Sequence, residues 1–212
     1  RRIGGKIKNG DFLHIDITKE KPKKIFDAAF SIDTSVVPQG IGADTIATLD
    51  GYSREDVDAF ALESQRRASQ ARDRGYFDRS VVPVKDVNGL TILERDDFIK
   101  PETTMEGLRN LRASFEQMGS MGYDDIVVKK YNTLDRIDHV HTAGNSSGIV
   151  DGASAVLIGN EKAGKDLGLT PRARIVAGSI LARDPIIMLA APGPSAKKCL
   201  RTAGLAVSDI DL

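Results

Sequence analysis

A dense run of small residues from Thr142 to Ala155 restricts the structures open to this chain more than any other feature. The run reads TAGNSSGIVDGASA and follows a short strand-like stretch, residues 138–141. Because glycine and serine contribute little apolar area on burial, their density does not serve a hydrophobic core. Such residues instead let the backbone approach another group closely. A tight packing site and a ligand-lining loop both fit this pattern.

Two helices are predicted upstream of this run. The apolar residues of 40–50 share one helical face, and an Asp-Gly pair then marks a turn. Ser53 is expected to cap the second helix, with Asp56 in its first turn and Gly75 as its stop. The buried face of this helix is expected to carry small and apolar residues at three- and four-residue steps: Val57, Phe60, Ala61, Ser64, Ala68 and Ala71.

Short strands and a helix are predicted next along the chain. Residues 81–84 and 90–93 read as two strands around an Asn-Gly turn, which is typical of a β-hairpin. An apolar stripe over 105–115 predicts a helix whose hydrophobic residues belong to the core. Residues 117–136 are expected to form an irregular excursion.

The last part of the chain again alternates helix and strand. A helix is predicted over 161–167 and a buried strand over 174–180. Ser195 is expected to cap a final helix that Gly204 ends. This alternation places the chain in the α/β class.

Charge and composition exclude several classes of partner. The 30 Lys and Arg are balanced by 30 Asp and Glu, so no overall field attracts nucleic acid or an anionic membrane. The longest apolar run, 186–191, is far shorter than the roughly 20 residues that a bilayer requires. We therefore expect neither a nucleic-acid nor a membrane partner. A single cysteine suits a reducing compartment, so a cytoplasmic location, or an organellar matrix, is expected.

Residues 1–30 differ from the rest in composition. They contain eight Lys or Arg and four Asp or Glu, and residues 12–17 form a strand candidate within them. We expect a basic, loop-rich lead-in. A solvated surface segment and a phosphate-gripping arm are both consistent with this charge.

The candidate reactive residues each have a structural alternative. Cys199 stands near Lys198 and Arg201, which would favour a nucleophilic thiolate, but its helical spacing favours a small core residue. His139 and His141 would share one strand face and could begin a metal site. No third ligand or HExxH spacing accompanies them, so structural hydrogen bonds are favoured and no metal is expected.

Five collinear segments resemble the thiolase family, the acyl-CoA C-acyltransferases also called acetyl-CoA acetyltransferases. Residues 142–153 resemble the family segment TAGNSSGINDGAAA. The other four resemble the family's MGxTAE helix start, SREDQDAFAxxSQ helix, PLARI and DPxxMGxGP segments, and they are residues 38–44, 53–65, 169–175 and 184–194. The match runs from about Val36 to Leu212, which leaves residues 1–35 outside it.

The resemblance implies a layered αβαβα fold of two similar βαβαβ halves, with an inserted loop domain that covers coenzyme A. On that map residues 31–136 form the loop domain. Residues 137–168 end the N-terminal half, and residues 169–212 begin the C-terminal half. Coenzyme A and acyl-CoA are implied as substrates, with no other cofactor, and a second copy as partner in a dimer or tetramer.

The family's reactive groups do not match residues of this chain. Thiolases perform a Claisen condensation or its reverse with an acylated cysteine, and a second cysteine and a histidine move the proton. The C-x-S-G, GHP and C-x-G-G-G motifs that carry these groups are not found here, and Cys199 matches neither cysteine. We therefore expect the central portion of a larger thiolase, with no catalytic residue and no activity alone. A non-catalytic acyl-CoA-binding or assembly module on the same fold is the alternative.

The resemblance carries binding residues instead. Ser147 matches a serine that hydrogen-bonds the pantetheine arm, and Met188 matches a methionine that lines the same tunnel. Lys100 falls where some members place an arginine near the adenine or phosphate end; it keeps the charge without the planar face. Asn145 and Gly148, in the same small-residue segment as Ser147, complete the predicted binding set.

Overall fold

The structure is a computed structural model, and it describes residues 36–211. The predicted lead-in 1–30, with its strand candidate, lies outside the described residues. The first elements are α2 (Gln39–Asp50), α3 (Arg54–Asp73), β1 (Val84–Lys85), β2 (Thr91–Leu93) and α4 (Met105–Arg109). They are followed by α5 (Glu116–Met118), the π-helical turn η2 (Gly119–Tyr123), α6 (Asp124–Lys130), α7 (Glu161–Asp166), α8 (Pro192–Ala203) and the 3₁₀ turn η3 (Val207–Asp209).

The first two predicted helices are confirmed, together with the signals that bound them. Helix α2 ends at Gly51, whose φ of 75° is the left-handed conformation that favours glycine. At the start of α3 the Ser53 hydroxyl accepts the Asp56 N–H at 3.2 Å. The Asp56 carboxylate in turn accepts the Ser53 N–H at 2.8 Å, which completes a capping box. Short-range hydrogen bonds therefore fix both helix boundaries.

The buried face of α3 differs from the prediction. Phe60, expected in the buried stripe, is 81% exposed. The fully buried side chain on this helix is instead Asp58, and Ser69 is also buried. The prediction failed because it assigned burial to apolar residues. Among the described residues, α3 instead buries the polar side chain of Asp58, whose hydrogen bonds compensate for its lost hydration.

The β-hairpin is confirmed, although its strands are shorter than predicted. Strands β1 and β2 pair antiparallel, with Val84 opposite Leu93 and an irregularity after it. The turn is fixed by Asp86, whose Oδ1 accepts the backbone N–H groups of Asn88 and Leu90 at 2.8 Å each. Gly89 has a φ of 86°, which explains why glycine stands there.

The region from 105 to 136 departs from the prediction in two ways. The helix predicted over 105–115 stops after α4, and only Leu108 of its stripe is buried. Residues 117–136 were expected to be irregular; α5, η2 and α6 occupy this region as far as Lys130, with a kink at Gly122, and only 131–136 are irregular as predicted. These helices form because Tyr123 and Val127 bury their side chains against α2, a tertiary contact that local spacing does not reveal.

The hydrophobic core joins α2 and α6 to two distant segments. Its buried members are Val37, Ile41, Tyr123, Val127, Ile137 and Ile186. At Gly42 an added Cβ would lie 2.8 Å from the Ile186 carbonyl oxygen, so only glycine permits this close backbone approach. The core therefore fixes residues 137 and 186, which flank the small-residue run in the sequence, onto α2.

The predicted strands after the hairpin are wrong for the part of the chain that the structure describes. Residues 138–141 and 174–180 run without ladder hydrogen bonds, and Ile175 and Ile180 are exposed. A strand exists only where another strand pairs with its backbone, and within 36–211 the only ladder is β1–β2. The local residue patterns of these two segments therefore predicted strands for which the described residues provide no partner strand.

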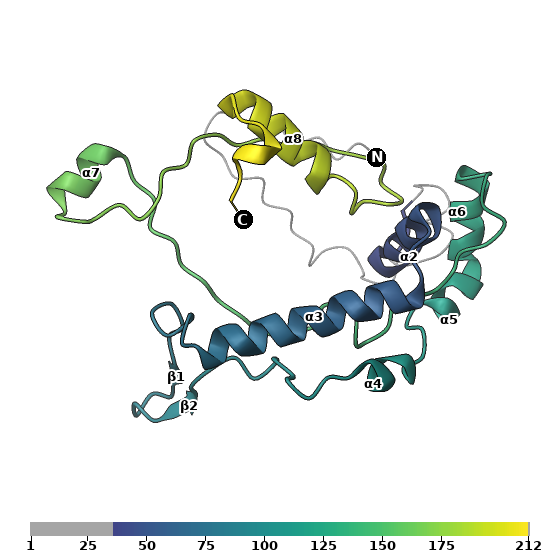
Figure 1. Cartoon of the computed structure of the whole chain (residues 1–212), viewed down its shortest axis with the longest axis horizontal. Helices are drawn as coiled ribbons and strands as arrows, with labels where there is room; N and C mark the ends of the chain where they lie inside the picture. The colour runs from purple at the N-terminus through teal and green to yellow at the C-terminus, as the bar shows by residue number, and fades with distance from the viewer. Residues whose placement is uncertain (1–35, 212) are drawn as a thin grey trace, which may run out of the picture.

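Helices α7 and α8 are confirmed with one change. Asn160 caps α7 by accepting the Ala163 N–H at 2.8 Å, and Gly204 ends α8 with a φ of 71°. Helix α8 begins at Pro192, so Ser195 is not its cap. Figure 1 shows α7 and α8 away from the long helix α3, reached by extended chain. None of the helices described is long and apolar enough to cross a membrane.

Candidate functional site

The small-residue segment 142–148 is held at its start by the buried carboxylate of Asp44 on α2. Asp44 Oδ1 accepts the backbone N–H groups of Val140 and His141 at 3.1 Å each. The same oxygen lies 2.6 Å from His141 Nδ1, and Oδ2 lies 2.8 Å from His139 Nδ1. Asp44 is completely buried, so these four contacts replace its lost hydration.

The two histidines therefore serve as hydrogen-bond partners, as the sequence favoured. His139 also reaches Asp124 at the start of α6, with Nε2 to Oδ2 at 3.0 Å. Burial alone raises the pKa of Asp44, but the hydrogen bonds from His141 and His139 outweigh it and hold that pKa below its usual value. Among the residues described, no group of three or more His, Cys, Asp or Glu side chains is arranged to hold a metal ion.

Asn145 ties the middle of the segment to α3. Its Oδ1 accepts the Thr142 N–H at 2.7 Å, which closes the turn. Its amide nitrogen donates to Asp58 Oδ1 at 2.8 Å and to the Val140 carbonyl at 3.1 Å. Arg54 donates from Nε to Asp58 Oδ2 at 2.8 Å, so this buried carboxylate is fully engaged.

Two glycines of the segment lie directly against other side chains. A Cβ on Gly144 would lie 2.5 Å from the Leu108 side chain, and one on Gly148 would lie 2.2 Å from the Phe98 ring. Close packing, one of the two interpretations of the small-residue run, is therefore present. The ligand-lining interpretation concerns the outer side, where Ser147 is exposed.

Lys100 lies beside this segment through Phe98. The Lys100 ammonium nitrogen is 5.3 Å from the centre of the Phe98 ring, a cation–π contact, and that ring covers Gly148. The backbone N–H of Lys100 donates to Gln65 Oε1 on α3 at 2.8 Å. The predicted cation and the predicted glycine are thus brought together by an aromatic ring.

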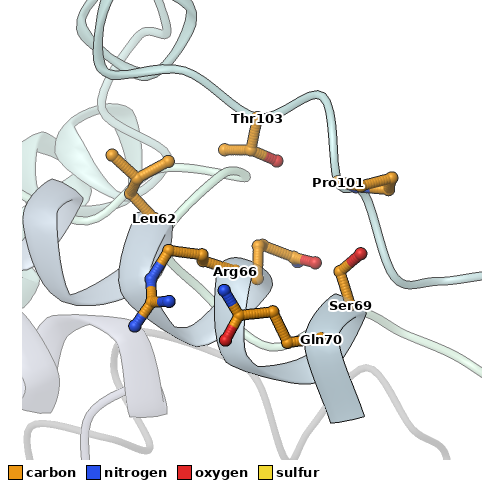
Figure 2. A pocket seen from close by; sticks show the side chains of 7 residues that line it. Leu62, Arg66, Ser69, Gln70, Pro101 and Thr103 are labelled. Atoms are coloured by element: carbon orange, nitrogen blue, oxygen red, sulfur yellow. The ribbon is translucent and has the colours of Figure 1, made fainter. Parts of the chain in front are cut away.

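A pocket adjoins Lys100 on the same side of α3. It has a volume of about 350 Å³ and is lined by Leu62, Gln65, Arg66, Ser69, Gln70, Pro101 and Thr103. Figure 2 shows Arg66 and Gln70 on the helix and Thr103 on the loop opposite. Arg66 is engaged by Glu63 at 2.5 Å, and hydrogen bonds from Arg66 and Arg67 lower the pKa of Glu63 to about 2.

Met188 lies on a separate turn that α2 and α6 hold. Lys130 of α6 forms an ion pair with Asp184 at 2.7 Å, and Asp184 Oδ1 accepts the Ile186 N–H at 2.9 Å. Ile186 is buried against α2, and Met188 is 38% exposed. Asp184 thus fixes the turn from which Met188 projects.

Comparison with known proteins identifies the family. The model of the thiolase N-terminal domain matches residues 16–126, which is more than half of the chain. The chain belongs to the thiolase family. It is 39% identical to 3-ketoacyl-CoA thiolase of Aliivibrio fischeri over 176 residues, which is 82% of this chain and 41% of that protein. It is 38% identical to mitochondrial 3-ketoacyl-CoA thiolase of Bos taurus over 85% of this chain and 41% of that protein.

Solved thiolase structures agree with this assignment. Human mitochondrial 3-ketoacyl-CoA thiolase matches with a TM-score of 0.70 and 32% identity, over 98% of this chain and 47% of that one. The same human enzyme in complex with CoA matches equally, with 46% of that chain covered. The predicted α/β class and thiolase-type fold are thereby confirmed. The chain spans less than half of the length of these thiolases.

The sequence did not reveal three residues that organise this part of the thiolase chain. Asp44, Asp58 and Phe98 were not predicted as site residues, although they hold the segment that was. A signal existed for Asp44, since it falls three residues after Ile41 on the buried face of a helix, where an isolated carboxylate requires partners. Phe98 carried no comparable signal.

Proposed function

We propose that this chain is the CoA-covering central portion of a thiolase-type acyl-CoA C-acyltransferase. The observation that supports this most directly is the anchoring of segment 142–148. Asp44 holds the two residues before it, Asp58 binds its Asn145, and Ser147 stays exposed next to Gly148, which Phe98 covers. A rigid segment with an exposed hydroxyl and a nearby cation is suited to a long polar ligand with phosphates.

Each predicted binding residue then has a role toward coenzyme A. The Ser147 hydroxyl hydrogen-bonds an amide of the pantetheine arm, and Lys100 attracts the phosphates of the nucleotide end. Gly148 lets Phe98 cover the segment, Asn145 orients it, and Met188 supplies an apolar wall for the acyl arm. The pocket beside Lys100 offers additional room at the nucleotide end.

The proposed reaction of the complete polypeptide is acyl transfer at the sulfur of coenzyme A. In the degradative direction the bond between the α- and β-carbons of a 3-ketoacyl-CoA breaks. The acyl group passes to the thiol of free CoA, and the departing α-carbon takes a proton. The reverse direction is a Claisen condensation. We assign no catalytic role to Cys199.

A binding and turnover assay tests this proposal. We expect the 212-residue chain to bind CoA without cleaving a 3-ketoacyl-CoA, and the complete polypeptide encoded with it to cleave that substrate. Turnover by the chain itself would contradict our proposal that the reactive cysteine is not among these 212 residues. CoA binding by both without any turnover would favour the non-catalytic binding module, as would coding DNA that lacks the C-x-S-G and GHP motifs on either side.

The domain map and assembly belong to the same proposal. We assign residues 31–136 to the loop domain, 137–168 to the N-terminal half and 169–212 to the C-terminal half. We also infer a homodimer or homotetramer in the cytoplasm or an organellar matrix. Sedimentation of the complete polypeptide would reveal its assembly, and a monomer at micromolar concentration would contradict it.

A further inference from the structure

We propose that His139 is a positioning residue that acts as a charged clamp between α2 and α6, and that its proton controls how firmly segment 142–148 is held. The link from this clamp to coenzyme A rests on the proposed function. The clamp itself rests on the contacts of His139.

Both ring nitrogens of His139 face carboxylate oxygens. Nδ1 lies 2.8 Å from Asp44 Oδ2, and Nε2 lies 3.0 Å from Asp124 Oδ2. A neutral imidazole has a single N–H, so with ionised carboxylates one of these contacts would place two acceptors against each other. An imidazolium donates to both. The geometry therefore requires the charged form of His139.

Two carboxylates surround His139, so its protonation decides whether their negative charge is balanced. The ionisable groups that face it are Asp44 from α2 and Asp124 from α6; His141, from its own segment, binds the other oxygen of Asp44. The His139 side chain is only 9% exposed and that of Asp44 is fully buried. Among the residues that the structure describes, Asp124 Oδ1 is buried without a hydrogen-bond partner, so the contact of Oδ2 with His139 is important for this carboxylate.

Loss of this proton loosens the start of the segment. Without it, one carboxylate loses its donor, and two negative charges, the buried Asp44 and the partly exposed Asp124, remain at either side of a neutral ring. Asp44 accepts the backbone N–H groups of Val140 and His141, so a displacement of this carboxylate displaces their backbone as well. Because Asn145 also binds the Val140 carbonyl, the displacement passes into the segment.

The direction of the pH dependence follows from the contacts. Burial alone lowers the pKa of His139, but the hydrogen bonds that its ring donates to Asp44 and Asp124 outweigh burial and raise that pKa above its usual value. The clamp is therefore closed below the usual histidine pKa and is lost as pH rises through the raised pKa. The pKa of Asp44 is lowered, so this carboxylate stays ionised until the solution is more acidic than its usual value.

Nitrogen-15 NMR of the histidine rings in the full chain tests the clamp without any ligand. The His139 signals are assigned by their loss in His139→Gln. We expect both ring nitrogens to be protonated at pH 6.5, with a titration midpoint above that of free histidine and lowered by Asp124→Asn. A neutral tautomer at pH 6.5, or a midpoint that Asp124→Asn does not move, would overturn the proposal.

Calorimetric titration with acetyl-CoA then tests the link to the ligand. Acetyl-CoA is chosen because it has no free thiol to ionise. We expect the affinity to fall about fivefold between pH 6.5 and 9 in the wild type and to be nearly flat in His139→Gln. Identical pH profiles in both would overturn the link to ligand binding. Absence of binding at every pH would instead contradict the proposed function, and the NMR titration would still decide the clamp.

Discussion

The side-chain amide of Asn145 donates to Asp58 Oδ1 at 2.8 Å, across 87 residues of sequence. Asp58 is completely buried in α3, and its second oxygen is bound by Arg54. This carboxylate therefore joins the long helix α3 to the segment that we propose binds coenzyme A. The connection is polar although it lies in the interior.

Removal of the Asp58 carboxylate should destabilise the chain. Asp58→Ala leaves Arg54 and Asn145 without their acceptor, and breaking a buried pair in this way costs about 3–5 kcal/mol. Urea denaturation measures the loss. Asp50→Ala, at an exposed position of α2, is the matched control and should change stability by less than about 0.5 kcal/mol. Equal effects of the two substitutions would contradict the role given to Asp58.

Gly148→Ala should force Phe98 away from the segment. The new Cβ would lie 2.2 Å from the ring, so we expect a loss of about 1–3 kcal/mol of stability. Gly152→Ala is the control because nothing lies within 4 Å of its added Cβ. In a double-mutant cycle Phe98→Ala should remove most of the effect of Gly148→Ala. Strict additivity would show that the two residues are not in contact.

Lys100→Ala should weaken CoA binding in a salt-dependent way. Lys100 is exposed, and an exposed ion pair is worth about 1 kcal/mol, so a drop of about fivefold is expected at low salt. The difference from wild type should shrink at high ionic strength. Lys165→Ala on α7 is the control and should bind as the wild type does. A salt-independent loss would indicate that Lys100 acts by packing on Phe98.

Ser53→Ala should shorten or fray α3 at its start. Loss of an N-cap hydroxyl costs about 1 kcal/mol, whereas Ser64→Ala, at an exposed position within the same helix, should be neutral or slightly stabilising. Hydrogen bonds from Ser53 lower the pKa of Asp56, so the cap contributes above the usual Asp range and weakens as pH falls through the lowered value. The acid side of the stability profile should therefore flatten in Ser53→Ala. An unchanged profile would contradict this assignment.

The sequence was sufficient where structure depends on neighbours along the chain. The capping box at Ser53, the stops at Gly51 and Gly204 and the turn at Gly89 all follow from short-range hydrogen bonds or positive φ. The small-residue run was also recognised from composition alone. Its resemblance to a family segment indicated the thiolase family, because that resemblance depends on residue order and not on tertiary contacts.

The sequence was insufficient where structure depends on distant partners. The helices within 116–130 follow from burial of Tyr123 and Val127 on α2, and the exposure of Phe60 follows from the polar face that α3 buries. The strand predicted over 174–180 had no partner among the described residues. For the same reason Asp44 and Asp58 were not foreseen as anchors, because the groups of segment 138–145 that bind them are 87 or more residues away.

Calorimetric titration of CoA into wild type and Ser147→Ala tests the central claim most directly. Ser147→Ala removes one hydroxyl from an exposed position, so the fold should be unaffected. We predict that CoA affinity falls about fivefold, the effect of one neutral hydrogen bond of about 1 kcal/mol. Ser154→Ala, exposed in the same small-residue run, should bind as tightly as the wild type. An affinity of Ser147→Ala equal to that of wild type would contradict the assignment of this segment to CoA binding.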